Sequence, residues 1–456
     1  MIHRVNCEPC DEELQQLIIH DPLGRNQDIN AMLNLLPNIE GGLSIFLDGN
    51  WGTGKTYFVR SLKLAIDALN AANRESESDL ARLFECERTW EQDYLPIYFN
   101  AWHYDYWDDP LAPIALTLAS ETDSAQFVTE DSDGAALKAA AISLVETILN
   151  SVFTGLGTAL ASAGRAIQPK DLLESFKSRN RLREQIVEVI DGILRERANK
   201  LILIVDELDR CEPKFACKLL EEFKALFELD NVVVLYALNV KQIACVIEAQ
   251  YGANFDGKRY LSKFYDLQLP IRTITMDDYL TYKTVNPGNL SSITMKAVID
   301  AHGMSLRETN RLIDRCKGYT SCLSSQYLTN ETLFVIGFIL IIASGIRAIN
   351  PTDYDRLINH GDESIFVTEI SQSVQIKKLF KSLISPCLNP QASEQINQDD
   401  AFAAEVARAV ALLAWNKQFQ EKQSAFKLMK QVSKGGLIEA LESCRDTLSR
   451  LDGIRS

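Results

Sequence analysis

Residues 43–57 read Leu-Ser-Ile-Phe-Leu-Asp-Gly-Asn-Trp-Gly-Thr-Gly-Lys-Thr-Tyr. The segment opens with a mostly apolar run typical of a short buried strand, and a helical pattern follows the glycine-rich turn. The turn matches G-x-x-x-x-G-K-[ST], in which backbone N–H groups and the N-terminus of the next helix surround phosphate groups. A strand before the turn and a helix after it are the context that this interpretation needs. The segment therefore predicts a phosphate-binding loop.

Each residue of this loop has an expected part in binding ATP. We expect Lys55 to reach the β- and γ-phosphates and the Thr56 hydroxyl to ligate Mg²⁺. The backbone would cradle the phosphates, because glycine permits the tight turn that points successive N–H groups inward. The predicted ATP-binding residues are Gly49, Asn50, Trp51, Gly52, Thr53, Gly54, Lys55, Thr56 and Tyr57.

Further strands are predicted beyond the loop, at 95–99, 201–205 and 232–238. Helical patterns separate successive strands, and 43–47, 95–99 and 201–205 are apolar on both faces. Such strands are typical of a parallel sheet that is covered by helices on both sides. The predicted fold class is α/β: a P-loop NTPase core with a helical insertion, followed by an all-α lid and C-terminal region.

The order of these patterns also predicts the domains. An N-terminal segment, 1–40, precedes a nucleotidase core at 41–275, which carries a helical insertion at about 120–195. Strand signals then fade and helical ones dominate. We expect a helical lid at 276–330 and a C-terminal helical domain at 331–456.

A pair of acids closes the strand at 201–205. A buried strand would deliver Asp206 to the carboxyl edge of the sheet, beside the phosphate loop, where it can hold the Mg²⁺ shell. Glu207 is then the candidate to polarise the attacking water. Downstream of a phosphate loop, this pair favours a hydrolysing enzyme over a passive nucleotide holder. Arg210 follows closely, either as a structural salt-bridge partner or as a contact to the γ-phosphate on a neighbouring subunit.

Composition limits the class of protein. The chain has 456 residues with a net charge of −15, which argues against a surface that binds nucleic acid throughout, although a local basic patch would survive that average. The ten cysteines and the polar opening sequence fit a reducing cytoplasm, with peripheral membrane association left open. Cys7 and Cys10 are either half of a zinc site or an ordinary N-terminal pair.

Two apolar stretches raise the question of a membrane. The stretch 333–346 lies between Glu331 and Arg347, which leaves about 15 uncharged residues where a spanning helix needs roughly 20. The stretch 135–167 is longer, but charged residues interrupt it. We expect a buried core helix for the first and a helical hairpin for the second, and no stable membrane insertion.

These motifs together resemble the KAP family of P-loop NTPases, which is related to the AAA+ and STAND groups. The resemblance implies that a short motif before the first strand lies near the adenine. It also implies a functional asparagine at the end of the second strand and an arginine on the helical lid. Asn239, after the fourth strand, could orient water or touch the γ-phosphate, as a polar sensor does. The residues that carry the resemblance are Gly49, Trp51, Gly52, Gly54, Lys55 and Thr56, Asp21–Gly24 with Asp28, Phe99–Trp102, Asp206–Arg210, Tyr251–Pro270, and Ser305–Arg307 with Arg311.

The sequence departs from the family pattern in two places. Members often carry transmembrane helices in the insertion, whereas this chain has only the weakly apolar stretch 135–167. The fourth strand usually ends in an acid followed by arginine, whereas here it ends in Asn239-Val240. An asparagine can still orient water, so the departure leaves hydrolysis open.

The resemblance implies an ATPase in which ATP binding or hydrolysis drives assembly or a conformational switch. Bacterial members are associated with exclusion of phage beside a partner effector, so we expect such a partner and a homo-oligomer. Arg259, Lys263 or Arg307 would meet phosphate in cis or in trans. His103 is either a packing or substrate-contact residue or a catalytic one. The alternatives are a nucleotide-gated protein-binding scaffold with little hydrolysis, and a small-molecule kinase.

Overall fold

The computed structural model describes residues 9–73, 79–84, 90, 92–123, 143, 169–196, 198–226, 229–252, 254–272, 274–283, 289–322, 329–415 and 419–442. The chain divides into two compact units, one from Asn6 to Thr273 and the other from Ile274 to Ser456. Most of the small-residue stretch at 135–167 and Cys7 lie outside the described residues.

The first unit is built on a five-stranded parallel sheet with strand order β2-β3-β4-β1-β5. The predicted α/β class with a parallel sheet is therefore confirmed. The strands are β1 (Leu43–Asp48), β2 (Tyr94–Asn100), β3 (Lys200–Asp206), β4 (Val232–Leu238) and β5 (Leu267–Pro270). The last of these was not predicted, because it is short and alternates between half-buried and exposed residues.

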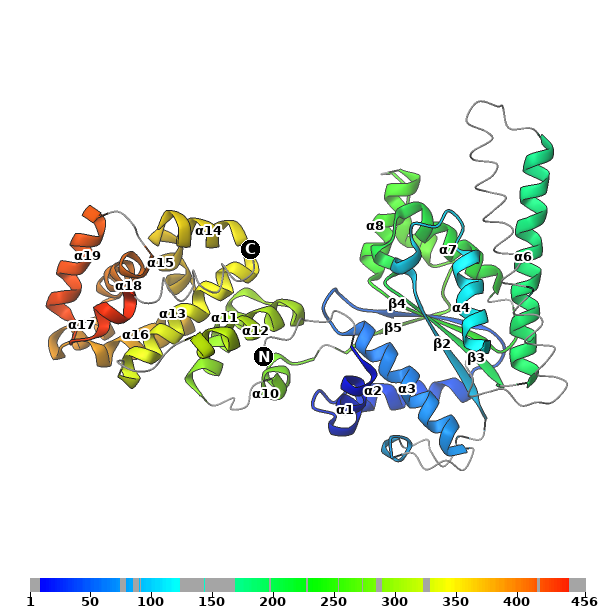
Figure 1. The fold of residues 1–456 in the computed structure, drawn as a ribbon, viewed down its shortest axis with the longest axis horizontal. Coiled ribbons are helices and arrows are strands. Elements are labelled where there is room, and N and C mark those ends of the chain that lie inside the picture. Colours follow the sequence, from blue (N-terminus) through cyan, green and yellow to red (C-terminus); the bar gives the residue numbers. More distant parts are fainter. Residues whose placement is uncertain are drawn as a thin grey trace. The chain divides into compact units, whose positions relative to one another are not determined.

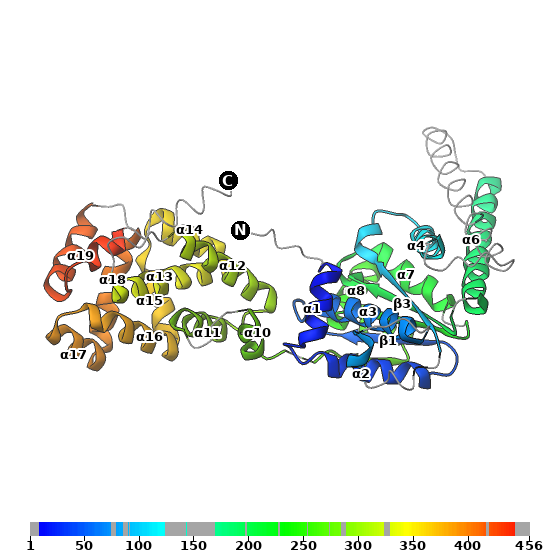
Figure 2. The ribbon, with the colours of Figure 1, turned by 60° about the horizontal axis from the view of Figure 1, so that its bottom comes forward.

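Helices cover both faces of this sheet, as Figures 1 and 2 show. On one face lie α1 (Asp11–His20), α2 (Asn26–Leu35) and α3 (Lys55–Asn73). The other face carries α4 (Leu111–Asp123), α6 (Pro169–Glu196), α7 (Pro213–Leu226), α8 (Val240–Tyr251) and α9 (Gly257–Leu261). Every residue of β3 and β4 is buried, because successive side chains of a strand enter opposite cores.

The second unit is helical in its described residues, apart from an isolated bridge between Leu388 and Ser433. Its helices are α10 (Met276–Lys283), α11 (Leu290–His302), α12 (Leu306–Cys322), α13 (Asn330–Ile349), α14 (Pro351–His360), α15 (Glu363–Gln372), α16 (Val374–Ile384), α17 (Pro390–Gln398), α18 (Asp400–Trp415) and α19 (Phe419–Val432).

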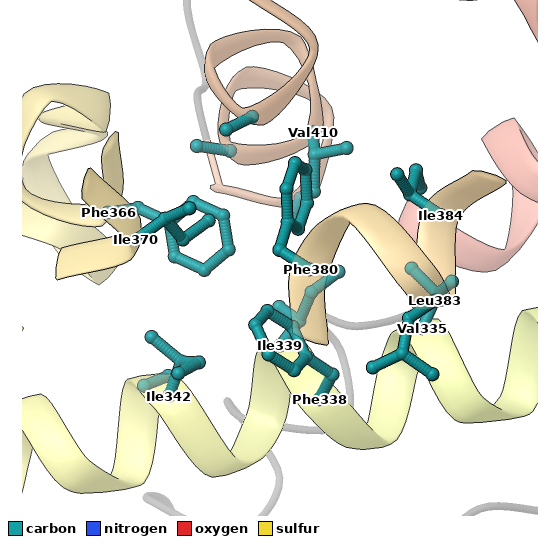
Figure 3. Packing of buried hydrophobic residues seen from close by; sticks show 14 of the residues in the cluster. Val335, Phe338, Ile339, Ile342, Phe366, Ile370, Phe380, Leu383, Ile384 and Val410 are labelled. Atoms are coloured by element: carbon teal, nitrogen blue, oxygen red, sulfur yellow. The ribbon is translucent and has the colours of Figure 1, made fainter. Parts of the chain in front are cut away.

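Helix α13 lies at the centre of this second unit. Figure 3 shows its side chains Phe338 and Ile339 beside Phe380 of α16, with Phe366 of α15 and Val410 of α18 closing the same core. Among the described residues, α13 is the one helix long and apolar enough to cross a membrane, yet 67% of that apolar window is buried inside the protein. The helix expected in this stretch is thus a core helix of the unit.

Candidate nucleotide-binding site

The carboxyl edge of the sheet collects the polar residues that the sequence singled out. In a parallel sheet, the loops after neighbouring strands meet at this edge. Glu207 follows β3, Asn239 follows β4 and the phosphate loop follows β1, and these three strands lie side by side in that order. On the far side of β3, Asn100 of β2 lies opposite Asp206 in the strand register. The topology therefore brings together residues from distant parts of the chain.

The phosphate loop depends on its glycines. Gly52 and Gly54 have φ angles of 80° and 86°, a left-handed backbone that other residues rarely adopt. Gly49 is needed for a different reason: a Cβ there would lie 2.3 Å from Ile271 Cγ2 and 2.8 Å from Thr53 Oγ1. The loop therefore packs directly against the segment that follows β5, and any side chain at Gly49 would displace it.

Lys55 begins α3 and turns back over the loop. Its Nζ donates hydrogen bonds to the carbonyl oxygens of Gly49 at 2.6 Å and Asn50 at 3.2 Å. Burial lowers the pKa of Lys55, while the nearby acids, Asp209 first and Asp206 next, act in the opposite direction. The ammonium group thus lies at the loop with two neutral carbonyl partners that an anion could replace.

Asp206 is the most deeply buried acid of the site, with 1% of its surface exposed. Its carboxylate accepts hydrogen bonds from Tyr98 Oη at 2.9 Å and from the backbone N–H of Glu207 at 2.9 Å, and the Thr56 hydroxyl lies close enough to act on it as a further donor. Burial raises the pKa of Asp206, and these three donors counteract the rise. The first residues of α3 and the last residue of β3 are therefore in direct contact.

Glu207 has an unusual backbone conformation and a raised pKa. Its φ of 62° is left-handed, a conformation that costs a non-glycine residue about 1 kcal/mol or more and is common at functional sites. Burial, followed by the charge of Asp206, raises the pKa of Glu207 to about 7. Its carboxylate forms an ion pair with Arg210, whose guanidinium lies 5.3 Å from the centre of the Trp102 ring. Of the two interpretations of Arg210, the structure displays the intramolecular salt bridge.

Asn239 caps the N-terminus of α8. Its Oδ1 accepts a hydrogen bond from the backbone N–H of Gln242 at 3.1 Å, and its Nδ2 lies 3.4 Å from Asn50 Oδ1 of the phosphate loop. Its own backbone N–H donates to Asp209 Oδ2 at 3.1 Å. The side chain is therefore oriented by the helix it caps and faces the loop.

The motif before the first strand also reaches the loop. Arg25 Nη2 donates to the carbonyl oxygen of Thr53 at 2.9 Å, and its Nη1 pairs with Asp28 at 3.2 Å. Asp28 pairs in turn with Arg272, just beyond β5, at 3.3 Å. The pKa of Arg25 is lowered by burial, although the guanidinium stays charged. Arg25 therefore binds the phosphate loop directly, and Asp28 and Arg272 hold Arg25 in place.

The remaining predicted residues lie on several different elements. Arg307 lies on α12, in the second unit, whereas Arg259 is on α9 of the first unit and Lys263 follows that helix. His103 is exposed, and its Nε2 lies 3.4 Å from Asn100 Nδ2 at the end of β2. Tyr57, in the first turn of α3, is 38% exposed.

The residues present suit a magnesium-bound triphosphate. Mg²⁺ prefers oxygen ligands and is usually held by one or two protein groups together with phosphate oxygens. The hydroxyl of Thr56 and the carboxylate of Asp206 provide such a pair, already in contact. Among the described residues, no three His, Cys, Asp or Glu side chains are grouped to hold a metal by themselves. A Mg²⁺ ion held by Thr56 and Asp206 would take its remaining ligands from phosphate oxygens and water.

Sequence reasoning missed several contacts of the site. Tyr98, which donates to Asp206, carries no motif and is recognisable only once β2 and β3 are paired. Asp48, at the end of β1, binds the backbone N–H of Val240 at 2.9 Å and Gln268 Nε2 at 3.0 Å. Trp51 Nε1 donates to Asp209 Oδ2 at 3.0 Å. Trp51 and Asp209 both stood within recognised motifs, but the spacing of the motifs gives no sign of their contact.

The fold and the site define a P-loop nucleotide-binding protein. The family model of the KAP family P-loop domain matches residues 25–282, more than half of the chain. The chain therefore belongs to the KAP family of P-loop NTPases, and the resemblance drawn from its motifs is confirmed. No curated protein matches the chain in sequence. The family domain implies nucleotide binding and, as a rule, Mg²⁺.

Proposed function

We propose that this protein is a Mg²⁺-dependent ATPase. The observation that carries the proposal is the contact between the Thr56 hydroxyl and the buried carboxylate of Asp206, next to the Lys55 ammonium. These groups come from the start of α3 and the end of β3, and they are the groups that a magnesium-bound triphosphate requires. Family membership supports the same proposal.

Each residue has a proposed role. Lys55 exchanges its loop carbonyls for the β- and γ-phosphate oxygens, and the backbone of the loop binds the phosphates. Thr56 and Asp206 hold the cation, which supplies Lewis-acid stabilisation of the phosphate charge. Glu207, whose pKa is about 7, takes a proton from the attacking water once it leaves Arg210. Asn239 orients that water or contacts the γ-phosphate.

We further propose that this ATPase acts as a switch. Bound ATP would order the phosphate loop, Asn100, Asn239 and the lid that carries Arg307, and loss of the γ-phosphate would relax them. We propose that the lid spans residues 276–330 and that a helical domain at 331–456 binds the partner protein. We propose a cytoplasmic homo-oligomer that, on family grounds, works with an effector protein in defence against phage.

A nucleotide-gated scaffold with little hydrolysis is the second candidate. The ion pair between Glu207 and Arg210 favours it, because a carboxylate held by a guanidinium is a poor acceptor for a proton from water. In that case ATP binding alone would control a partner protein.

ATP turnover in two variants separates these functions. Lys55→Ala removes the phosphate contact and should abolish both binding and turnover, whereas Glu207→Gln should retain binding and lose turnover at least a hundredfold, the scale of a general base. Full turnover in Lys55→Ala would refute the ATPase proposal. Negligible turnover by the unsubstituted protein, with tight ATP binding, would favour the scaffold. Transfer of labelled γ-phosphate to an acceptor other than water would instead indicate a kinase.

A further inference from the structure

Asp209 joins two parts of the site that the proposed mechanism treats separately. It lies in the short 3-10 turn Leu208–Arg210 after β3 and is only 3% exposed. Its Oδ2 accepts a hydrogen bond from Trp51 Nε1 at 3.0 Å and another from the backbone N–H of Asn239 at 3.1 Å. One carboxylate oxygen therefore connects the phosphate loop with the end of β4.

The two ends of this connection have different surroundings. The start of α8 is also held by Asp48, which binds the N–H of Val240 at 2.9 Å, and by the capping bond of Asn239. Trp51, by contrast, is 51% exposed, so burial of its ring does little to fix its position. The bond to Asp209 is a charge-assisted hydrogen bond, so it restrains Trp51 more than the partial burial of its ring does.

We propose that Asp209 is a positioning residue that fixes the phosphate loop, through Trp51, relative to Asn239. The inference rests on the proposed ATP site and adds to it a link between phosphate binding and the polar sensor. Asp209 itself does not contact phosphate, since its negative charge would repel it. Movement of the loop on binding ATP would instead pass through the indole and the carboxylate to the backbone of Asn239.

Two single variants and their combination test this link. Trp51→Phe retains an aromatic ring but removes the N–H donor, and Asp209→Asn removes the charge. A hydrogen bond to a charged group is worth about tenfold or more in an equilibrium constant, so KM for MgATP should rise about tenfold in either variant. In Asp209→Asn, kcat should fall as well, because the restraint on Asn239 is weakened, whereas in Trp51→Phe the effect should fall mainly on KM.

The combined variant gives the decisive comparison. If Trp51 acts through Asp209, the double variant should resemble Asp209→Asn alone rather than show the product of the two fold-changes. Asp108→Asn is the matched control, because Asp108 is a surface acid of the same unit with a side chain that is 96% exposed, and turnover should not change.

Two results would overturn this inference and leave the proposed function standing. One is an unchanged KM in Trp51→Phe while the unsubstituted protein hydrolyses ATP normally, a result that stands even if Asp209→Asn fails to fold. The other is a double variant whose fold-changes multiply. An unsubstituted protein that does not bind MgATP would overturn the proposed function and this inference together.

Discussion

Replacement of Gly49 by alanine tests how the phosphate loop is held in place. The added Cβ would lie 2.3 Å from Ile271 Cγ2 and 2.8 Å from Thr53 Oγ1, far inside contact distance. Ile271 is 8% exposed and Thr53 Oγ1 is bonded to the Asn50 carbonyl, so neither yields freely. Overpacking of this kind costs about 1–3 kcal/mol. If the loop moves to relieve it, ATP affinity should fall about tenfold for each 1.4 kcal/mol.

The assay combines amide hydrogen exchange in β1, which reports the opening of the first unit, with titration of MgATP. Ile271→Ala removes the nearer clashing atom and by itself should cost about 2–5 kcal/mol through the cavity it leaves. With both changes present, the total cost should be less than the sum by about 1 kcal/mol or more, because the new methyl group occupies the vacated space. Additive costs, or a Gly49→Ala protein with normal stability and affinity, would refute the reasoning.

Two predictions concern the helical second unit. The pKa of His302 is raised above its usual 6.5 by its hydrogen bond with Glu369, so this contact stabilises the unit fully below about pH 6.5 and less as pH rises through the raised pKa. Thermal melts between pH 6 and 8 should show this loss of stability, and His302→Gln should flatten it; an unchanged slope would contradict the assignment. Gly345→Ala places a Cβ 2.5 Å from Val298 Cγ1 and should destabilise α13 against α11 by about 1–3 kcal/mol. Gly337→Ala, on the same helix with nothing within 4 Å, is its control and should stabilise the protein by up to about 1 kcal/mol in the same melts; equal effects of the two changes would refute this packing.

The sequence predicted the parts of the site that depend on local pattern. Strand, glycine turn and helix stand next to one another around Lys55, so their arrangement needs no long-range information. The end of a buried strand placed Asp206 at the same sheet edge, because parallel strands share their carboxyl side. The contact between Asp206 and Thr56 follows from these two local patterns and one rule of topology.

Other features depend on side chains that meet across the fold, and no spacing encodes them. The left-handed backbone of Glu207 was not foreseeable from an acidic motif. A salt bridge was one of the two interpretations of Arg210, but the sequence did not identify Glu207 as its partner. The bond between Trp51 and Asp209 joins motifs 158 positions apart. Strand β5 was missed because its period-2 pattern is four residues long and half exposed, too weak to distinguish from a loop.

Equilibrium binding of ATP, with and without Mg²⁺, tests the central claim most directly. The arrangement of Lys55, Thr56 and Asp206 predicts that the unsubstituted protein binds ATP, that Mg²⁺ tightens this binding, and that Thr56→Ala removes the effect of the cation while Lys55→Ala removes binding itself. ATP affinity that is the same in all three proteins and indifferent to Mg²⁺ would contradict the account.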